Sequence, residues 1–415
     1  MVKGILVIID GMGDIPNKQL ENMTPLGAAN TPNMDFLATR GEMGILYPVR
    51  PGFTPESDES VISLFGNDLV FGTRGQLEAI GADLELTRGD LALRANFSTI
   101  DSIDKGNILD RRAGRTLTAR ETEILADEIN KKVKLPCEFL FVPTLQHQAV
   151  LVFRGGFSEN VLGNDPTYIQ GKTSQITKIK YPSPLDDDEN SQYTANILNE
   201  FVKKSHEILK NHYINQERKE KGLLPTNYIL FRGLGIEPPK LKKYKKWLSI
   251  TYFPLEKGFS KVSGMEVFSF DYPKLKEIDS YSNIWEGLKK ACKFAIKTIK
   301  KQHKNFDYAY IHINEPDLAG HDNKPIEKKL MLEYIDKTLF AFLRKFAPPN
   351  NVVVVVTANH STPCKFKDHS AEPVPVLVYN GSLPREKKFN EVEAKKGTLG
   401  RIVGKDFFKK IGFNR

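Results

Sequence analysis

The segment from Asn351 to Ser370 reads NVVVVVTANHSTPCKFKDHS. Its five consecutive valines are β-branched, carry no charge and are too few to span a membrane, so they predict a fully buried strand. Two polar side chains that can bind a metal, Asn359 and His360, follow this strand, and a second imidazole, His369, comes nine residues later. Open α/β sheets place functional residues just beyond the carboxyl ends of parallel strands. The segment therefore favours a metal site, although a polar loop with two incidental histidines has the same pattern.

The length and composition of the chain are typical of a globular protein with more than one domain. It has 415 residues, of which 40% are hydrophobic and 27% are charged, enough for a sizeable core. No apolar run approaches the roughly 20 residues that a membrane span needs, and Asp10 interrupts the first apolar run too early for a secretory signal. We therefore expect a cytoplasmic protein. Cys137, Cys292 and Cys364 have no paired spacing, which argues against a disulfide framework and a cysteine-based zinc site.

The chain is basic, with a formal net charge of +9 and lysine runs over residues 240–246 and 289–304. A basic protein can bind nucleic acid, a membrane surface or small anions. The lysines have the spacing of solvated helix and loop faces, and no nucleic-acid motif is recognisable. We therefore expect neither a nucleic-acid nor a membrane partner, and a phosphorylated small substrate is an equally good use of the charge.

Two further strand ends carry carboxylates. Asp10 follows the short strand Gly4 to Ile9 and lies among glycines, which let the backbone fold closely around a metal; Asp-Gly is equally a common turn pair. Asp317 and His321 follow the strand Tyr308 to Ile313 and would share one face of a helical turn, a usable spacing for a divalent ion. The alternative for the second pair is a polar loop with an incidental histidine.

Ser57 lies where a turn-rich loop, residues 51–60, opens an apolar helix. A serine at a helix N-terminus sits at the positive end of the helix dipole, which favours an alkoxide or a bound phosphate. The simpler alternative is that Ser57 only caps the helix.

Arginines recur in short basic loops and at strand ends. The hexapeptide Asp110 to Arg115 contains three guanidinium groups, and Arg154 and Arg232 each precede a glycine at the end of a predicted strand. Arginine can hold a carboxylate or a phosphate through two parallel hydrogen bonds. These residues together predict an anion pocket, whereas surface turns are the alternative for each loop alone.

Hydrophobic periodicity places these motifs on alternating strands and helices. An alternating strand over Leu91 to Thr99 directs Leu91, Leu93, Ala95 and Phe97 to one side. The predicted helices are Thr118 to Lys132, Asn190 to His212, Asn283 to His303, Ile326 to Arg344 and Thr398 to Lys410.

Several longer motifs run along nearly the whole chain. They are DGMGD at 10–14, LGAANTPNMD at 26–35, PESD at 55–58, GTRGQLEAIG at 72–81, DRRAGR at 110–115, RGLG at 232–235, PDLAGH at 316–321 and HSAEPVP at 369–375. As a set, the motifs are specific, and the chain resembles the archaeal-type 2,3-bisphosphoglycerate-independent phosphoglycerate mutases of the alkaline-phosphatase superfamily.

This resemblance implies an α/β fold with two domains. Residues 1–87 and 245–415 would form a discontinuous, metal-binding, phosphatase-like domain, and residues 88–244 an inserted substrate-binding domain. The implied enzyme is an isomerase of glycolysis and gluconeogenesis. It would interconvert 3-phosphoglycerate and 2-phosphoglycerate through a phosphoserine, without 2,3-bisphosphoglycerate as cofactor. The implied partner is a small phosphoglycerate, and the oligomeric state is not predicted.

The resemblance also implies a set of site residues. Ser57 would be the nucleophile, and two divalent cations would be bound, usually Mn²⁺, Mg²⁺ or Co²⁺ and sometimes Zn²⁺. Asp317, His321 and His369 would hold one cation, and Asp10, Ser57, Asn359 and His360 the other. The implied substrate-binding residues are Arg74, Asp110, Arg111, Arg115, Arg154, Arg232 and Lys257.

Two positions depart from the family pattern. Asn359 stands where the family normally has Asp, and Glu56 where it commonly has Gly. Asn brings no charge, so the second cation should bind more weakly and activate Ser57 less. A related metal-dependent phosphohydrolase and a weakened or non-catalytic relative therefore remain alternatives to the mutase, although the arginine-rich insert argues against the hydrolase.

Overall fold

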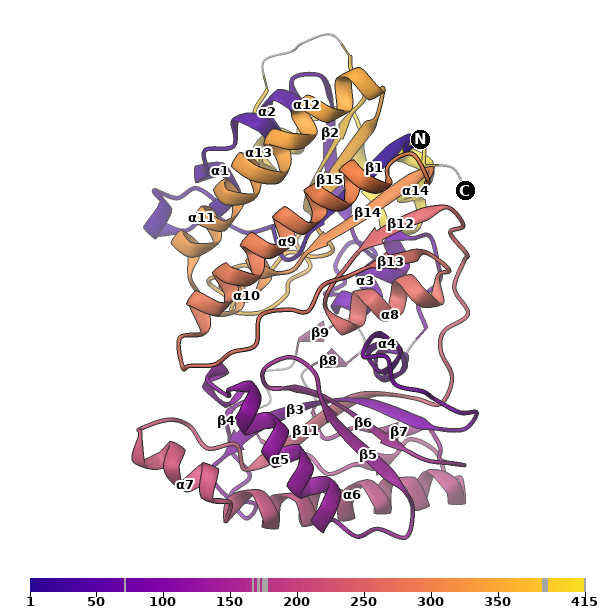
Figure 1. Cartoon of the computed structure of the whole chain (residues 1–415), viewed down its shortest axis with the longest axis vertical. Helices are drawn as coiled ribbons and strands as arrows, with labels where there is room; N and C mark the ends of the chain where they lie inside the picture. Colours follow the sequence, from indigo (N-terminus) through magenta and orange to yellow (C-terminus); the bar gives the residue numbers. More distant parts are fainter. Residues whose placement is uncertain (71, 166–167, 170–171, 174–177, 383–386, 414–415) are drawn as a thin grey trace.

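The computed structural model describes residues 1–70, 72–165, 168–169, 172–173, 178–382 and 387–413. The chain forms an α/β protein built on two sheets (Figure 1), and this confirms the predicted fold class. An eight-stranded sheet lies at the top of the view and a five-stranded sheet at the bottom. Within the described residues, none of the helices combines the length and apolarity that a bilayer crossing requires.

The first sheet contains strands from both ends of the chain. In spatial order they are β13 (Glu266–Phe268), β12 (Trp247–Ile250), β14 (Tyr308–Ile313), β1 (Gly4–Ile9), β15 (Val353–Thr357), β16 (Val374–Tyr379), β2 (Gly41–Tyr47) and β17 (Gly400–Val403). β1 pairs in parallel with β14 on one side and with β15, the predicted valine strand, on the other. Ile9 lies opposite Ile313 and Ile8 opposite Thr357, so the residues that follow these three strands meet at one edge.

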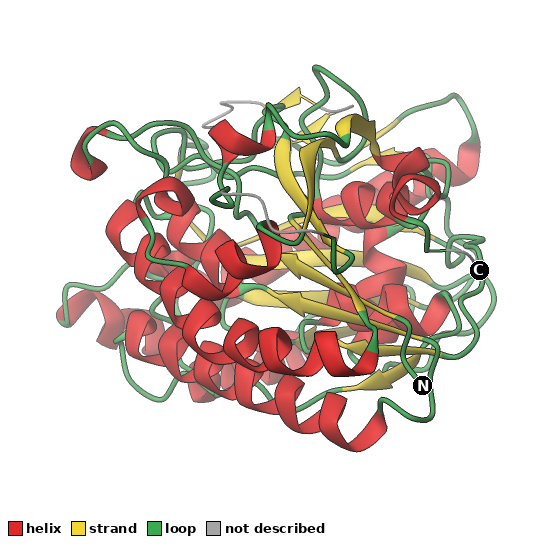
Figure 2. Cartoon of the chain, turned by 90° about the horizontal axis from the view of Figure 1, so that it is seen from above, coloured by secondary structure: helices red, strands yellow, loops and turns green. Residues whose placement is uncertain are grey.

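Helices lie on both sides of the first sheet (Figure 2). They are α1 (Pro25–Ala28), α2 (Pro32–Ala38), α3 (Ser57–Leu64), α8 (Pro254–Val262), α9 (Ser280–Gln302), α10 (Glu315–His321), α11 (Pro325–Ile335), α12 (Ala341–Asn350), α13 (Glu391–Ala394) and α14 (Phe407–Ile411). The predicted helix Ile326 to Arg344 corresponds to α11, a short π-helical stretch and α12. One continuous apolar core contains the buried residues of these elements.

The second sheet comes from the middle of the chain. Its strands are β11 (Tyr228–Gly235), β3 (Leu91–Ile100), β6 (Gln148–Phe153) and β5 (Phe139–Pro143), with β4 (Ile108–Asp110) paired to β3. Two short pairs complete the strands: β7 (Val161–Leu162) with β10 (Ser183–Pro184), and β8 (Tyr168–Ile169) with β9 (Lys172–Thr173). The remaining helices are α4 (Arg74–Gly81), α5 (Ala119–Lys132), α6 (Glu189–Lys210) and α7 (Tyr213–Glu220).

The alternation of β3 separates the two faces of the second sheet. Leu91, Leu93 and the other residues predicted to point the same way pack in one apolar core with residues of α5 and α6. Ala92, on the opposite face, packs with Ala79 of α4. Arg94 and Asn96 share this second face, because successive side chains of a strand point to opposite sides, and it faces the first sheet.

Helices α4 and α8 lie between the two sheets and cross at backbone contact (Figure 1). A Cβ atom on Gly81 would lie 1.7 Å from the carbonyl oxygen of Pro254, and one on Gly258 would lie 1.8 Å from that of Leu77. Only glycine fits at both positions, since real Cβ atoms do not approach so closely. The crossing fixes α8, and with it Glu256, relative to Arg74 at the start of α4.

The predicted helix Thr398 to Lys410 is wrong. Residues Gly400–Val403 form β17, which pairs in parallel with β2 at the edge of the first sheet, and helix begins only at Phe407. Gly400 has a φ of 65°, a left-handed conformation that interrupts a helix. The hydrogen bonds available at the edge of β2 outweigh local helix propensity. The domain boundaries at 87/88 and 244/245 stay a prediction.

Candidate active site

The seven residues predicted to bind metal meet at the carboxyl edge of the first sheet. Asp10 follows β1, Ser57 is the first residue of α3, Asp317 and His321 lie on α10, Asn359 and His360 follow β15, and His369 lies in the loop before β16. The parallel register of β14, β1 and β15 causes this convergence, because all three strands end at the same level.

The hydrogen bonds of two histidines determine which ring nitrogen faces the site. His321 Nδ1 lies 3.0 Å from the carbonyl oxygen of Lys367, and His369 Nδ1 lies 2.9 Å from that of Pro55. A carbonyl oxygen can only accept, so Nδ1 carries the proton in both rings. Each Nε2 therefore presents a lone pair to the site, the arrangement that metal-binding imidazoles use.

His360 presents the same nitrogen through a chain of hydrogen bonds. The Thr362 hydroxyl donates to Asp317 Oδ1 at 2.6 Å, and it lies 3.1 Å from His360 Nδ1. Since the single hydroxyl proton goes to Asp317, Thr362 must accept from Nδ1–H of His360. The Nε2 lone pair then points to the Ser57 hydroxyl, whose oxygen is 3.2 Å away. Burial, followed by the neighbouring His369, holds the pKa of His360 well below its usual value, so this ring is neutral.

The donor atoms around Asp317 fit a divalent cation. One ligand atom each from Asp317, His360 and His369 lies within 4.8 Å of the others, and His321 Nε2 is 3.4 Å from Asp317 Oδ2. A carboxylate with neutral imidazoles suits borderline ions such as Zn²⁺ or Mn²⁺. His360 lies between the Asp317 cluster and Asp10, because its Nε2 is also 3.3 Å from Asp10 Oδ1.

Asn359 is oriented by the backbone rather than by the site. Its Oδ1 lies 3.3 Å from the amide nitrogen of Gly11 and 3.0 Å from that of His360, and it accepts from both. The amide group Nδ2 is buried without a hydrogen bond of good geometry. Turning Oδ1 toward a cation would bring the two Nδ2 protons against two backbone donors. An aspartate could accept from the amides with one oxygen and bind a cation with the other.

Ser57 does not cap its helix. Glu56 is the N-cap of α3, and its amide nitrogen donates to Glu59 Oε2 at 2.8 Å. The hydroxyl of Ser57 is therefore available to His360. Burial, followed by the nearby Asp317 carboxylate, raises the pKa of Asp10 to about 8.

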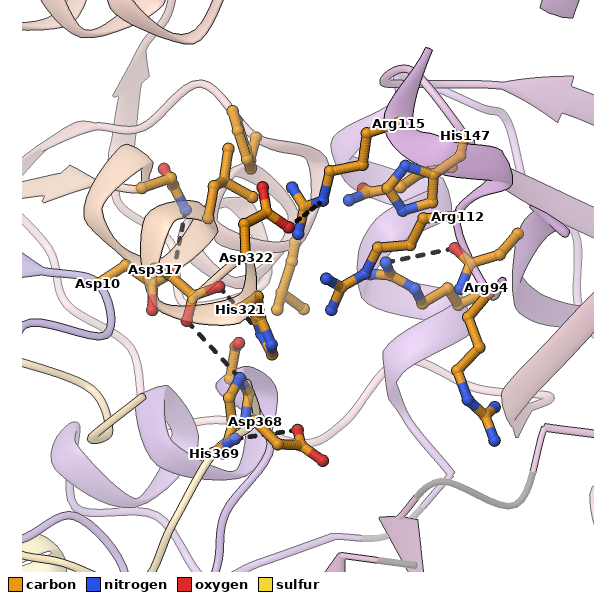
Figure 3. A pocket seen from close by; sticks show the side chains of 18 of the residues that line it. Asp10, Arg94, Arg112, Arg115, His147, Asp317, His321, Asp322, Asp368 and His369 are labelled. Carbon is orange, nitrogen blue, oxygen red and sulfur yellow. Dashed lines mark hydrogen bonds and ion pairs between the residues drawn. The ribbon is translucent and has the colours of Figure 1, made fainter. Parts of the chain in front are cut away.

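The cluster lies at one side of a cavity of about 890 Å³ between the two sheets. Figure 3 shows Arg94, Arg112 and Arg115 on the side of the second sheet, across from Asp317, His321 and His369. Of the predicted substrate-binding residues, the cavity is lined by Arg74, Asp110, Arg111, Arg115 and Arg232. The cavity lining does not include Arg154, which pairs with the buried Asp90, or Lys257, which lies 3.1 Å from Asp83.

The predicted substrate-binding arginines that line the cavity already have carboxylate partners. Arg111 and Arg232 both pair with Asp165, and Arg115 Nε lies 3.2 Å from Asp322 Oδ1. Arg74 and Arg232 also pair with Glu56. A substrate anion would therefore exchange places with, or join, carboxylates of the protein itself.

Sequence reasoning missed further cavity residues: Arg94, His147, Glu256 and Asn314. Sequence reasoning also missed His312, whose Nε2 lies 3.3 Å from Asp10 Oδ2. The alternation of Leu91 to Thr99 carried a signal for Arg94, because it places this side chain opposite the apolar face. A buried histidine one residue before the end of the strand Tyr308 to Ile313 was the signal for His312. Nothing in the sequence of α8 distinguishes Glu256 from a solvated helical glutamate.

Comparisons with known proteins agree on one family. A family model described as 2,3-bisphosphoglycerate-independent phosphoglycerate mutase matches residues 38–215. Curated proteins with this name from Thermococcus kodakarensis and Pyrococcus furiosus are each 37% identical to the chain, over 97% of its length and 95% of theirs.

Solved structures agree with this result. A Pyrococcus horikoshii protein is similar with a TM-score of 0.72 and 30% identity, covering 100% of this chain and 98% of that one. The cofactor-independent phosphoglycerate mutase of Thermoplasma acidophilum has a TM-score of 0.55 and 27% identity, with 99% of both chains covered. The chain therefore belongs to the 2,3-bisphosphoglycerate-independent phosphoglycerate mutase family.

Proposed function

We propose that this protein interconverts 3-phosphoglycerate and 2-phosphoglycerate, with Ser57 carrying the phosphoryl group between the two positions. The observation that carries the proposal is the 3.2 Å contact between the Ser57 hydroxyl and the Nε2 lone pair of His360. It places the predicted nucleophile beside an imidazole of the predicted cation site, at the edge of a cavity whose opposite wall carries arginines. The names of the relatives supply the substrate and the reaction.

Different residues of the chain have different roles in the proposed reaction. Ser57 Oγ attacks phosphorus, the bond from phosphorus to the glycerate oxygen breaks, and the proton of the serine hydroxyl passes to that departing oxygen. The arginines hold the carboxylate and phosphate of the substrate through paired hydrogen bonds. The released glycerate then turns in the cavity, and its other hydroxyl takes the phosphoryl group back from Ser57 while the proton of that hydroxyl returns to Ser57 Oγ.

Two divalent cations of the Mn²⁺, Mg²⁺, Co²⁺ or Zn²⁺ type would complete the site. Asp317, His321 and His369 would hold one, and Asp10, His360 and Ser57 the other, with Asn359 beside it. When bound, such cations lower the pKa of the serine hydroxyl and neutralise the phosphoryl oxygens. A cation held by Asp10 would favour the charged form of this buried carboxyl.

A mutase must exclude water, which would otherwise hydrolyse the phosphoserine. The cavity lies between the two sheets, and Glu56 ties α3 to the second sheet through Arg232 of β11. Closure of this cleft over the substrate would trap the glycerate. We keep a cytoplasmic location as a prediction, in agreement with the kind of substrate.

The proposal is tested with purified protein, Mn²⁺ and 3-phosphoglycerate. We expect 2-phosphoglycerate to form with the unmodified protein and Ser57→Ala to form none. Ser60→Ala is the matched control, because Ser60 lies on the same helix and its hydroxyl donates to the carbonyl oxygen of Glu56. The melting temperature should be similar for the unmodified protein and Ser57→Ala.

Two results would contradict the mutase. Release of inorganic phosphate without 2-phosphoglycerate would identify a phosphohydrolase. No product of either kind at saturating Mn²⁺ would identify a non-catalytic relative. Full activity of Ser57→Ala would show that another group accepts the phosphoryl.

A further inference from the structure

A second group of potential metal ligands lies beside Asp10, on the side away from His360. One ligand atom each from Asp10, Glu256 and His312 lies within 4.8 Å of the others. The three residues come from different elements: Asp10 follows β1, Glu256 lies in the first turn of α8, and His312 lies in β14. None of the predicted metal sets includes Glu256 or His312.

All three side chains are shielded from water. Their exposed fractions are 5% for Asp10, 2% for Glu256 and 0% for His312. Glu256 Oε2, His312 Nε2 and Asp10 Oδ1 are buried atoms without a hydrogen bond of good geometry, and Asn314 Oδ1 next to them is another. Within the described part of the chain, no lysine or arginine forms an ion pair with either carboxylate.

This arrangement is costly without a cation. Burying a carboxylate without a counter-charge costs several kcal/mol unless the group takes up a proton. An imidazolium at His312 would neutralise only one of the two carboxylates. A divalent cation would neutralise both and would use the unsatisfied lone pairs of Glu256 Oε2 and His312 Nε2.

The geometry also separates this group from the Ser57 side. Asp10 Oδ1 lies 3.3 Å from His360 Nε2, whereas Asp10 Oδ2 lies 3.3 Å from His312 Nε2. Asn314 Nδ2 donates to the same Oδ2 at 3.3 Å. The two oxygens of Asp10 therefore face two different clusters.

We propose that Asp10, Glu256 and His312 bind a divalent cation, in addition to the cations at Ser57 and Asp317. Two carboxylates suit Mg²⁺ and Mn²⁺, and an imidazole favours a first-row transition metal over Mg²⁺, so Mn²⁺ fits the complete set. Asn314 adds a further polar group beside Asp10, because its Nδ2 donates to Asp10 Oδ2 and its Oδ1 has no hydrogen bond. Such a cation acts on the reaction through Asp10: it holds this carboxylate in place and keeps it charged, with Oδ1 facing His360.

A cation can reach the group through the cavity. Asp10, Glu256 and Asn314 line this cavity, whereas His312 lies behind them. On the far side, the Tyr310 hydroxyl lies 2.7 Å from His312 Nδ1 and orients the ring so that Nε2 faces the two carboxylates. A hydrogen bond to the second ring nitrogen is the usual support of a metal-binding histidine.

The test counts bound Mn²⁺ by equilibrium dialysis of the full chain, without substrate. We expect Glu256→Gln and His312→Gln each to bind one equivalent fewer than the unmodified protein. Glu391→Gln is the matched control, because Glu391 is also buried and has an unpartnered oxygen but lies outside the cluster. Glu391→Gln should bind as many equivalents of Mn²⁺ as the unmodified protein. Glu256→Asp, which retains the charge on a shorter side chain, should bind the same number with weaker affinity.

An unchanged count and affinity in Glu256→Gln would overturn the proposal. If Glu256→Gln does not fold, Glu256→Asp and His312→Gln decide: unchanged Mn²⁺ affinity in both would overturn it as well. The metal count does not depend on mutase activity, so an inactive protein that loses one equivalent in Glu256→Gln would contradict only the proposed function.

Discussion

Glu56 Oε2 lies 2.6 Å from Arg74 Nη1, and the same oxygen lies 3.2 Å from Arg232 Nη2. One carboxylate of the protein thus pairs with two of the arginines predicted to bind substrate. Glu56 takes this position because it caps α3, directly before the proposed nucleophile Ser57. At this position, where glycine was expected from the resemblance, the chain has an internal anion that we expect to compete with a phosphate or carboxylate of the substrate.

We predict that Glu56→Gln lowers the KM for 3-phosphoglycerate. The amide keeps the size of the side chain but removes the charge that holds Arg74 and Arg232. A charge-assisted hydrogen bond contributes about 1.5–3 kcal/mol, so a KM lower by about tenfold is the expected scale, measured from initial rates. Glu217→Gln, an exposed glutamate on α7, controls for the change in net charge.

A higher KM in Glu56→Gln would reverse this interpretation. It would mean that Glu56 positions the two arginines for the substrate instead of competing with it.

Arg115 and Arg154 should behave differently, although both were predicted to bind substrate. Arg115 is buried at the cavity wall, and Nη1 has no hydrogen bond. Arg154 lies outside the cavity lining and pairs with Asp90, whose side chain is fully buried. We expect Arg115→Ala to raise KM by about 10- to 100-fold, since a charge-assisted contact is lost, with little change in melting temperature.

Arg154→Ala should instead lower the melting temperature, because it leaves the Asp90 carboxylate buried without its cation. Its KM should remain close to that of the unmodified protein. A large loss of stability in Arg115→Ala with unchanged kinetics would show that this arginine only supports the fold.

The residues at strand ends were predictable because the pattern of the strands fixes where they end. Asp10 and His360 each follow an apolar run, and parallel pairing brings such ends together whatever the loops do. The burial of Glu256 beside Asp10 and the ion pairs of Glu56 could not be predicted from the sequence. The environment of Glu256 depends on the crossing of α4 and α8, and the partners of Glu56 come from the second sheet, so both roles arise from contacts between segments far apart in the chain.

The buried glutamate Glu391 should make stability depend on pH. Thr24 Oγ1 donates to Glu391 Oε2 at 2.6 Å, and burial raises the pKa of this carboxyl from 4.5 to about 7. Between these values the folded state holds a proton that the unfolded state has released, so stability falls as the pH rises from 4.5 to 7. The loss is on the order of 3 kcal/mol for one group.

Urea unfolding between pH 5 and 8, with a chelator to exclude metal effects, measures this dependence. Glu391→Gln cannot titrate, so its free energy of unfolding should fall less with pH and exceed that of the unmodified protein at pH 8. Glu393→Gln, on the same helix and paired with Lys396, should leave the slope unchanged. Equal slopes for all three proteins would show that Glu391 is charged in the folded state.

Asn359 should limit the second cation of the proposed mutase site. Asp317 with His321 and His369 offers a carboxylate and two imidazoles, whereas Asn359 holds its oxygen toward two backbone amides. The Ser57 site should therefore fill only at higher Mn²⁺ concentration than the Asp317 site, and activity without added metal should be low. Asn359→Asp adds an anionic oxygen while the other oxygen keeps the amides, so it should tighten the Ser57 site and raise activity at limiting Mn²⁺.

Asn380→Asp controls for the change in net charge in this last prediction. It adds the same charge at an exposed position outside the cavity lining. It should therefore not raise activity at limiting Mn²⁺. A titration in which the unmodified protein fills the Ser57 and Asp317 sites with equal affinity, and in which Asn359→Asp gains nothing, would contradict the prediction. Such a result would mean that Asn359 releases its backbone amides to bind the cation, or that the Ser57 site draws its charge from Asp10 alone.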